Sequence, residues 1–235
     1  VRLLDTAGVD LSCFRVDRAA QTGHLLRETD AVGGERRLLF PGANARLTEE
    51  EIRSAFLTAP DAVCLVGDLP SAILSRIGEI AAERGVPLFY LLTAGTTRCE
   101  ELPRLEILMT DEETAERMTG ITPSGTDSCL QAAIGLQKRI SARYYIIKLG
   151  ERGAFLYDGT YCYVVNSFIV PDTDSRGANE VFFGATVCDY VREGGEVLAA
   201  LRYASAASAL SKTHEGEASS PPTADEVLSF LERNG

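Results

Sequence analysis

The segment with the clearest chemical potential is residues 174–185, which read DSRGANEVFFGA. A glycine-containing turn runs directly into an apolar helix, and the first N–H groups of such a helix have no partner within it. Those groups, together with the helix dipole, favour a bound anion. Glu180 falls in the first turn of this helix, where its carboxylate could accept a proton from a substrate hydroxyl. It could equally serve to complement the helix dipole, and the local sequence supports both interpretations.

A second candidate is the segment KLGERGA, residues 148–154. A strand is predicted to end at Lys148, and Gly150 and Gly153 flank the turn that follows. Glycines after a strand let the backbone approach a ligand closely, typically a phosphate or a nucleotide ring. On its own, however, the motif favours an ordinary strand–turn–strand connection.

The composition narrows the chemistry that these segments can support. The 235 residues carry a formal net charge of −11, which argues against a nucleic-acid partner because phosphate backbones are bound by basic stripes. A small anion held in a local pocket is still allowed. His24 and His214 are the only histidines and neither has a partner at metal-ligand spacing, which argues against a zinc site or a Ser-His-Asp triad.

The cysteines and the apolar runs indicate a cytoplasmic protein without a membrane partner. No CxxC pair occurs, and we interpret the six cysteines as reduced, buried, small apolar residues: Cys13, Cys64, Cys99, Cys129, Cys162 and Cys188. No apolar run approaches the roughly 18 residues that span a bilayer. No signal peptide is visible at the start of the chain.

The elements that must position the two segments alternate between strands and helices from residue 48 onward. A first helix opens with a capping box of Thr48 and Glu51, and a second ends at Gly85. Strands are predicted at AVCLVG, VPLFYLL, LEILM and ARYYIIKLG, a hairpin around Asp158-Gly159, and late helices over 178–193, 196–212 and 223–233. This alternation predicts an α/β fold with a mostly parallel sheet covered by helices on both faces, which binds ligands beyond the carboxyl ends of its strands.

The residues before this core follow a different pattern. CFRVD, GHLLRET and RRLLF read as short strands, with Gly33-Gly34 as a hairpin turn between the last two. We therefore expect a small antiparallel β flap, a lid, over residues 10–44. The α/β core is expected over residues 45–235 together with residues 1–9.

Taken together, these segments resemble the ribokinase-like carbohydrate kinases of the PfkB family. The family's order and approximate spacing are kept by GHLLRETDAVGGERRLLFPGANARLTEEEI, DEETAERMTGI, IIKLGERGA, DSRGANEVFFGA and ASAASALSKTHEGEASSPPTADEVLSFL. The resemblance covers essentially all 235 residues but begins inside the family pattern. We therefore expect roughly its first quarter to be absent, including the first strands and a Gly-Gly sugar motif that Gly33-Gly34 does not represent.

The resemblance implies a kinase that transfers the γ-phosphoryl group of ATP to a sugar hydroxyl. The family signature, Asp-Thr-x-Gly-Ala-Gly-Asp before an apolar helix, implies that Glu180 is the catalytic base. It also implies that Gly177, Ala178 and Asn179 form the anion hole that stabilises the transferred phosphoryl group.

The resemblance also implies cofactor and substrate positions. The nucleotide would be bound by Lys148, Gly150, Gly153 and Ser205. The sugar would be contacted by Asp68 and Asp174. Mg²⁺ would lie near Asp111 and Glu112, and a monovalent cation near Asp174, Gly216 and Ser220. We thus expect ATP and Mg²⁺ as cofactors, with K⁺ as a further candidate, and a homodimer formed through the open edges of the flap strands.

Two signature positions are altered at the start of the late helix. Asn179 replaces the last glycine, and its side chain crowds the phosphoryl path unless Asn adopts the same positive φ. Glu180 replaces Asp and is one methylene longer, which moves its carboxylate by about an ångström, a displacement that can cost about a hundredfold in rate.

The family's Asn-x-x-Glu motif, which helps to organise hydrated Mg²⁺, is altered as well. It appears here as residues 111–114, so that Thr114 replaces the Glu. Asp111 or Glu112 could compensate for this loss. The structural alternative is that Thr110 and Glu113 form a capping box at this helix start.

Two functions follow from these observations. The first is an active kinase for a sugar or nucleoside, with candidates that include ribose, fructose, ketodeoxygluconate and adenosine. The second is a catalytically inactive relative that binds a sugar or nucleotide for regulation, or that serves as a scaffold through its flap. A nucleotide-binding oxidoreductase ranks below both, because no GxGxxG follows a first strand.

Overall fold

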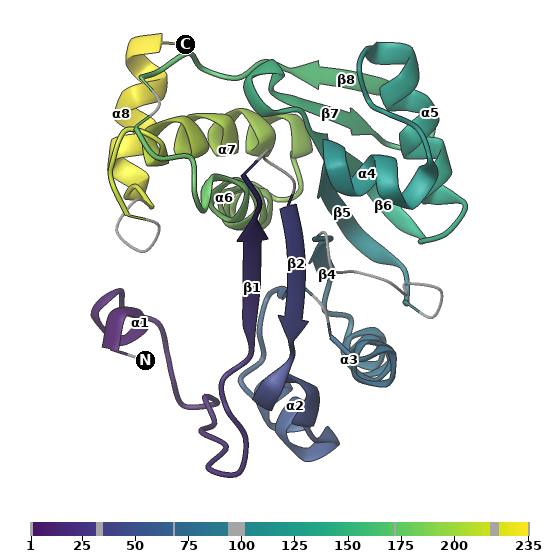
Figure 1. Cartoon of the computed structure of the whole chain (residues 1–235), viewed down its shortest axis with the longest axis vertical. Helices are drawn as coiled ribbons and strands as arrows, with labels where there is room; N and C mark the ends of the chain where they lie inside the picture. Colours follow the sequence, from purple (N-terminus) through teal and green to yellow (C-terminus); the bar gives the residue numbers. More distant parts are fainter. Residues whose placement is uncertain are drawn as a thin grey trace.

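The computed structural model describes residues 2–31, 35–67, 69–93, 102–171, 173–216 and 221–234. Its main feature is a six-stranded sheet in the order β3-β4-β5-β6-β7-β8 (Figure 1). Four strands are parallel: β3 (Val63–Val66), β4 (Leu88–Leu91), β5 (Leu105–Asp111) and β6 (Ala142–Lys148). The antiparallel strands β7 (Ala154–Tyr157) and β8 (Cys162–Val165) complete it. The predicted α/β fold is confirmed.

Helices cover both faces of this sheet. One face packs against α2 (Glu49–Phe56), α3 (Ser71–Arg84), α4 (Glu112–Thr119) and α5 (Thr126–Gln137). The other packs against α6 (Ala178–Arg192) and α7 (Val197–Ser211), and α8 (Ala224–Asn234) packs against the outer side of α7. The central strands β5 and β6 are therefore buried on both faces, which explains their nearly continuous apolar sequence.

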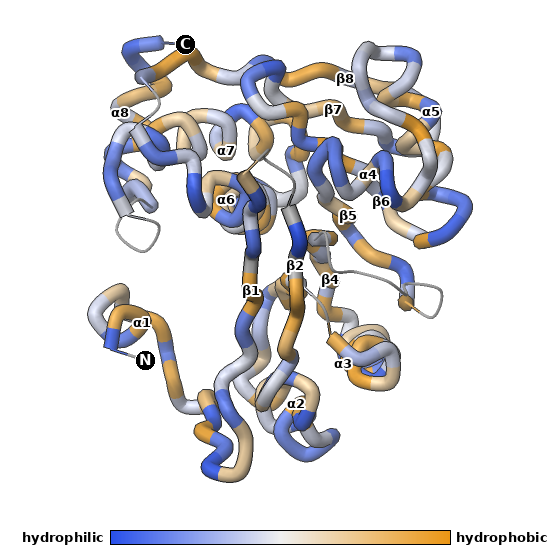
Figure 2. The backbone as a smooth tube through the Cα atoms, in the orientation of Figure 1, coloured by the Kyte–Doolittle hydropathy of each residue, from blue (hydrophilic) through white to orange (hydrophobic). Residues whose placement is uncertain are grey.

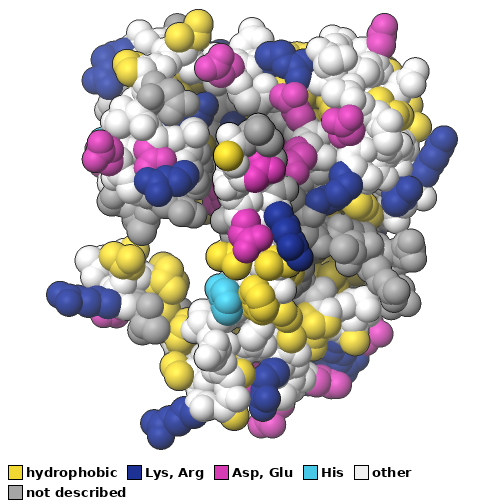
Figure 3. Space-filling model, in the orientation of Figure 1, with side chains coloured by type: hydrophobic (Ala, Val, Ile, Leu, Met, Phe, Trp, Pro, Cys, Tyr) yellow, Lys and Arg dark blue, Asp and Glu magenta, His cyan; other side chains and the backbone are white. Residues whose placement is uncertain are grey.

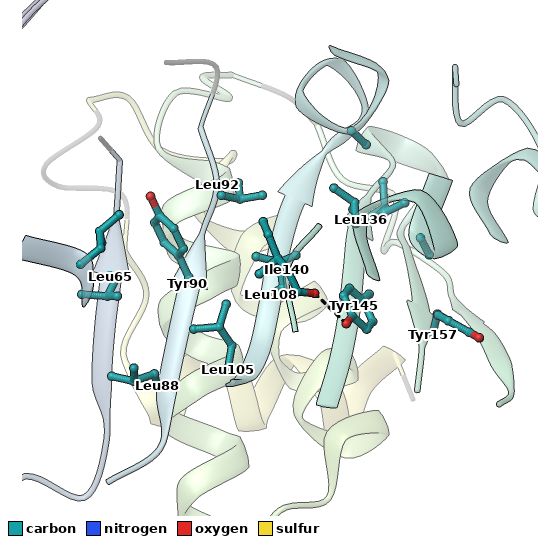
Figure 4. Close-up of a cluster of buried hydrophobic side chains, with 14 of the residues drawn as sticks. Leu65, Leu88, Tyr90, Leu92, Leu105, Leu108, Leu136, Ile140, Tyr145 and Tyr157 are labelled. Atoms are coloured by element: carbon teal, nitrogen blue, oxygen red, sulfur yellow. Dashed lines mark hydrogen bonds between the residues drawn. The ribbon is translucent and has the colours of Figure 1, made fainter. Parts of the chain in front are cut away.

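The core on the α2–α5 side consists of interdigitating aliphatic and tyrosine side chains (Figure 4). Tyr145 is almost fully buried, and its hydroxyl donates a hydrogen bond of 2.9 Å to the carbonyl of Ile140. The Tyr90 hydroxyl likewise donates to the carbonyl of Gly67. Both phenols are satisfied, so the large rings are buried without an unpaired polar group. Figure 2 shows the apolar strands running through the interior of the core.

Two helix-end signals and one hairpin signal in the sequence are borne out. Thr48 and Glu51 form the expected capping box at α2. Gly85 ends α3 in the left-handed conformation, with φ 67°. The hairpin at Asp158-Gly159 joins β7 to β8, with the Asp158 N–H donating to the carbonyl of Tyr161.

The flap is a separate two-stranded sheet of β1 (His24–Thr29) and β2 (Glu35–Phe40), which projects from the core. It is preceded by the short helix α1 (Arg2–Thr6) and followed by a 3-10 helix, η1 (Gly42–Arg46). Apolar side chains gather on its visible face (Figure 3). Leu25 and Leu26, which are consecutive and so point to opposite faces, are both exposed. The Gly33-Gly34 turn lies outside the described residues.

The strand expected at residues 13–17 is not formed. Asp10 accepts a hydrogen bond from the N–H of Ser12, and Asp17 accepts one from the N–H of Ala19. These two local turns close the segment on itself, because short acidic side chains compete with ladder pairing. The alternating sequence pattern there was misleading.

The cysteines are more exposed than their sequence context suggested. The described cysteines are free thiols, but only Cys129 is buried, so burial was wrongly expected for Cys13, Cys64 and Cys188. Among the helices of the described ranges, none combines the length and apolar character needed to span a membrane.

Candidate active site

The candidate site lies where the carboxyl ends of β5 and β6 meet the start of α6. Lys148 ends β6 and pairs in register with Asp111, which ends β5. The ammonium nitrogen of Lys148 lies 5.2 Å from the ring centroid of Phe182, which belongs to the opening turns of α6. The two sequence motifs singled out for their chemistry, residues 148–154 and 174–185, are thus brought together at the end of a parallel sheet, the usual place for a ligand in such folds.

The start of α6 leaves backbone N–H groups free. Gly177 precedes the helix with φ 77°, a conformation that glycine adopts without strain. The N–H of Ala178 donates to the carbonyl of Ser175, and the N–H of Val181 donates to that of Gly177. For the amides of Asn179 and Glu180, the described part of the chain offers no acceptor. Two adjacent donors at a helix N-terminus are therefore available to an anion.

The backbone of Asn179 differs from what its replacement of glycine suggested. The left-handed residue is Gly177, whereas Asn179 lies inside the helix and has an ordinary negative φ. Substituting Asn for Gly therefore introduces no backbone strain at this position. The side chain of Glu180, one residue further, is exposed.

A hydrogen bond from α7 holds the start of α6 in place. Ser208 is buried, and its hydroxyl donates a 3.0 Å hydrogen bond to the carbonyl of Ala178. Ser205, one turn earlier on α7, is also buried, and its hydroxyl lacks a partner within the described ranges. A buried hydroxyl without a partner is rare enough to mark a place where a ligand or water can bind.

Asp174 has a defined structural role. Its carboxylate accepts hydrogen bonds from the guanidinium of Arg176, at 2.8 and 2.6 Å, and from the N–H of Gly216 at 3.1 Å. The N–H groups of Thr173 and Asp174 both donate to the carbonyl of Lys212 at the end of α7. The Arg176 guanidinium, and then the surrounding backbone N–H groups, hold the pKa of the Asp174 carboxyl well below its usual value.

The expected cation loop is thus brought together in part. Asp174 and Gly216 are in contact, but both carboxylate oxygens of Asp174 already accept from protein donors. Arg176 supplies the positive charge that a monovalent cation would otherwise bring. Ser220 and Asp68, the remaining predicted cation and sugar positions, lie outside the described residues.

Gly150 and Gly153 differ in the space that surrounds their Cα atoms. Gly150 has φ 58°, and an added Cβ would meet nothing within 4 Å, so its backbone is open to a ligand. Gly153 has φ 88°, and an added Cβ would lie 2.0 Å from the carbonyl oxygen of Val165. Gly153 is therefore required by close packing against the end of β8, whereas Gly150 leaves room beside the strand end.

Lys148 is buried, with 7% of its surface exposed. Burial, and then repulsion from Lys212, lowers its pKa from 10.5 to about 8. Although Asp111 is its register partner, the carboxylate of Asp111 accepts from the N–H of Thr114 at 2.8 Å and thereby caps α4. Within the described residues Lys148 forms no ion pair or hydrogen bond.

The predicted Mg²⁺ positions are occupied by structural contacts. The expected capping box of Thr110 and Glu113 is wrong, because Asp111 is the N-cap of α4. Glu112 pairs with Arg152 at 2.8 Å, and Arg152 also donates to the carbonyls of residues 123 and 124. The described ranges hold no cluster of three or more His, Cys, Asp or Glu side chains suited to a metal. These residues therefore fit Mg²⁺ only if nucleotide phosphates and water supply most of its ligands, which is common for this ion.

Three residues of this site escaped the sequence reasoning. Arg152 and Arg176 both lie inside the motifs, and their basic character next to an acidic partner was the available signal. Lys212 lies at the C-terminal end of α7, and nothing in the local sequence distinguishes it from a solvated lysine.

Comparison with known proteins identifies the fold and the family. Residues 1–224 match the pfkB family carbohydrate kinase model, and the chain belongs to this family of kinases. It is 27% identical to the ribokinase of Haemophilus influenzae, over 96% of this chain and 74% of that protein. It is 30% identical to an ATP-dependent ribose-1-phosphate kinase of Halopiger xanaduensis, over 98% of this chain and 74% of that protein.

The solved structures agree with the ribokinase-like fold. The Arabidopsis thaliana ribokinase complexed with ribose and ATP superimposes with a TM-score of 0.83 at 23% identity, covering 97% of this chain and 75% of that one. The predicted family and fold are confirmed, and the oxidoreductase alternative has no support. The chain spans about three quarters of the length of these relatives.

Proposed function

We propose that this chain is an ATP-dependent kinase that phosphorylates a hydroxyl group of a sugar or of a related compound. The observation that carries this proposal is the pair of free amides, of Asn179 and Glu180, at the carboxyl end of the sheet. An anion held there would lie beside the exposed carboxylate of Glu180. A phosphoryl acceptor site needs both groups, an anion hole and a base.

The reaction follows from these positions. Glu180 accepts the proton of the substrate hydroxyl, whose oxygen attacks the γ-phosphorus of ATP while the bond to the β-phosphate oxygen breaks and ADP leaves. The amides of Asn179 and Glu180, with those of Gly177 and Ala178 nearby, stabilise the charge that gathers on the transferred phosphoryl group. When bound with the nucleotide, Mg²⁺ neutralises phosphate charge.

The nucleotide is proposed to lie along the turn after β6. The open backbone at Gly150 and the unpartnered hydroxyl of Ser205 are the features that support it. Relatives whose names specify ATP, and solved structures holding ATP or ADP, support the choice of nucleotide. K⁺ has less support at Asp174, because Arg176 already neutralises that carboxylate.

The substrate is proposed to be a small sugar covered by the lid. Relatives include ribokinases, fructokinases and a ribose-1-phosphate kinase. These names support a sugar as the substrate but do not select one particular sugar. We propose that residues 10–44 act as the lid over a core formed by residues 45–235 and 1–9. The protein is proposed to work in the cytoplasm as a homodimer that forms through β1 and β2. Neither nucleic acid nor a membrane is proposed as a partner.

The proposal is tested by measuring ADP release in a coupled assay with MgATP and a panel of pentoses, hexoses, phosphorylated sugars and nucleosides. We expect sugar-dependent ADP release with at least one compound, and phosphorylated product of the corresponding mass. Release that is equal with and without every acceptor would reject sugar phosphorylation by this chain.

A second candidate function is nucleotide or sugar binding without turnover, and the altered residues Asn179 and Glu180 favour it. The double variant Asn179→Gly/Glu180→Asp restores the family signature and distinguishes the two. If the parent binds nucleotide without turnover and the variant gains it, the inactive relative is supported. If the parent turns over a sugar and the variant is slower, that alternative is rejected.

A further inference from the structure

The carboxylate of Asp174 lies in the turn that leads into α6 and accepts four hydrogen bonds. Its Oδ1 accepts from the backbone N–H of Arg176 at 3.1 Å and from the Nε of the same arginine at 2.8 Å. Its Oδ2 accepts from the Nη2 of Arg176 at 2.6 Å and from the N–H of Gly216 at 3.1 Å. A carboxylate offers about four lone-pair positions, so these donors fill the acceptor capacity of both oxygens.

The surroundings of Asp174 favour a positive charge. The N–H groups of Thr173 and Asp174 donate to the carbonyl of Lys212, at 2.8 and 3.1 Å, so the turn lies against the C-terminal end of α7. The carbonyl groups at a helix C-terminus carry a negative partial charge, which repels a carboxylate and attracts a cation. The side chain of Asp174 is only 11% exposed, so water and salt screen this repulsion less than at the surface. A cation is therefore favoured here, whether it is a bound ion or a side chain.

Arg176 supplies that cation from within the same turn. Its guanidinium binds the two carboxylate oxygens of Asp174 side by side, which is the geometry in which arginine pairs most strongly with a carboxylate. The side chain of Arg176 is 71% exposed, so the guanidinium lies on the solvent side of the carboxylate and covers it. The K⁺ ion that the family resemblance implied at Asp174 does not fit while Arg176 holds this position.

The ion pair lies directly before the groups of the candidate site. The turn that begins at Asp174 continues into α6, and the N–H of Ala178 donates to the carbonyl of Ser175 within the turn at 3.2 Å. The free amides of Asn179 and Glu180 follow. Because groups that bind a transferred phosphoryl must be held precisely, a charge that fixes the turn also fixes these amides.

Resting on the proposed kinase function, we propose that Arg176 is a built-in cation that holds the turn before α6, so that this chain works without a bound K⁺. Arg176 is a positioning residue, which acts through the turn on the amides of Asn179 and Glu180. Removing its charge should open the carboxylate of Asp174 to solvent. K⁺, which binds oxygen ligands, should then take the place of the guanidinium. A single substitution should thus make the chain dependent on K⁺.

The test compares the wild type with Arg176→Met, Arg176→Lys and the control Arg202→Met, which removes an exposed arginine of α7. Each protein is studied in potassium chloride and in tetramethylammonium chloride of equal ionic strength, because tetramethylammonium is too large to take the place of K⁺. Calorimetry measures the affinity for the non-hydrolysable ATP analogue AMP-PNP in the presence of Mg²⁺. Thermal unfolding measures stability.

The wild type and the control should show the same AMP-PNP affinity and melting temperature in both salts. In tetramethylammonium, Arg176→Met should bind AMP-PNP about tenfold more weakly than the wild type. Potassium should restore most of this loss and raise the melting temperature of the variant by about 2–4 °C. Arg176→Lys should recover part of the loss without potassium, because its ammonium supplies the charge but not the paired hydrogen bonds.

Three results would overturn the inference. The first is a wild-type protein that K⁺ stabilises or that binds AMP-PNP more tightly in K⁺. The second is an Arg176→Met variant that matches the wild type in both salts. The third is a loss in Arg176→Met that neither K⁺ nor Arg176→Lys recovers, because the arginine would then act through its shape and not through its charge. Recovery by K⁺ or by lysine supports the role of the charge.

The inference and the proposed function can fail separately. If the wild type binds no nucleotide, the melting temperatures still test Arg176, because only Arg176→Met should respond to K⁺. If Arg176→Met responds in this way but no acceptor is phosphorylated, the built-in cation stands and the kinase proposal fails. If the wild type phosphorylates a sugar only when K⁺ is present, the kinase proposal stands and the role of Arg176 is rejected.

Discussion

The start of α6 and the β1–β2 lid are held in opposite ways. The helix start is anchored by a buried hydrogen bond from Ser208, and the next residues, Phe182 and Phe183, are buried in the core. The lid is a two-stranded sheet whose apolar side chains, including Leu25 and Leu39, remain about half exposed. A hairpin of two strands is marginally stable by itself in water.

The start of α6 is thus suited to hold groups in fixed positions, whereas the lid is suited to move. Under the proposed function, the groups that stabilise charge in the transition state need fixed positions, and the start of α6 that carries them is packed against the core. Under the proposed function, the β1–β2 lid opens and closes over the substrate, and its exposed apolar side chains would be buried only when a substrate or a second copy covers them. Substitutions in the two regions should therefore have different consequences, and the following predictions use that difference from the largest expected effect to the smallest.

The largest effect is expected for Glu180→Gln, which keeps the size of the side chain and removes its basicity. The turnover number should fall by about a hundredfold to ten-thousandfold, the usual contribution of a general base. AMP-PNP affinity and the unfolding midpoint should stay near those of the wild type, because the side chain is exposed. The control is Glu83→Gln, an exposed residue of α3; turnover that survives Glu180→Gln would assign the proton to another group.

Lys148→Met should raise the free energy of unfolding at pH 7 by about 3 kcal/mol, the equivalent of a pKa lowered from 10.5 to about 8. Below pH 8 the lysine is charged in both states and the folded state bears the full cost of burying it. Between about pH 8 and 10.5 only the unfolded state is protonated, so wild-type stability rises with pH and the difference between the proteins shrinks. Urea unfolding of both proteins at pH 7 and pH 10 measures the difference in free energy of unfolding. A difference that does not change with pH would contradict the prediction.

Most of the fold was predictable because its signals are local and repeated. The helices α6 and α7 were expected over 178–193 and 196–212, and they were found at Ala178–Arg192 and Val197–Ser211. Apolar periodicity and capping residues set such bounds. The false strand at residues 13–17 shows the limit, since alternation predicts a strand only where a partner strand exists to pair with it.

For the candidate site, the sequence predicted which structural elements carry it but not how their charges are balanced. The turn and helix of residues 174–185 and the strand end at Lys148 follow from motifs and from the topology of parallel sheets. The motifs do not predict which charges neutralise one another. Asp174 pairs with Arg176 and Glu112 pairs with Arg152, whereas Lys148 has no ion-pair partner in the described residues. Such pairings depend on loop geometry and burial, which a sequence pattern does not encode.

Gly177→Ala tests how firmly the anchored region fixes its amides. A Cβ in the left-handed conformation costs about 1–2 kcal/mol, so the free energy of unfolding should fall by that amount. Any shift of the helix start would also reduce turnover, because an ångström of misplacement can cost about a hundredfold. Gly184→Ala is the matched control: this glycine lies within α6 and has room for a Cβ, so the substitution should be neutral or stabilise by up to about 1 kcal/mol.

The smallest effect on the fold is expected in the lid. Leu25→Ser and Leu26→Ser alter opposite faces of β1, and both side chains are already exposed, so the melting temperature of the core should change little. If the lid covers a sugar with one face and a second copy with the other, one variant should raise the KM for the sugar and the other should weaken dimerisation, each severalfold to about tenfold. Steady-state kinetics and analytical ultracentrifugation measure the two effects. Two variants that match the wild type in both measurements would show that these leucines are not covered by sugar or partner, and the exposed face of the hairpin would then need another occupant.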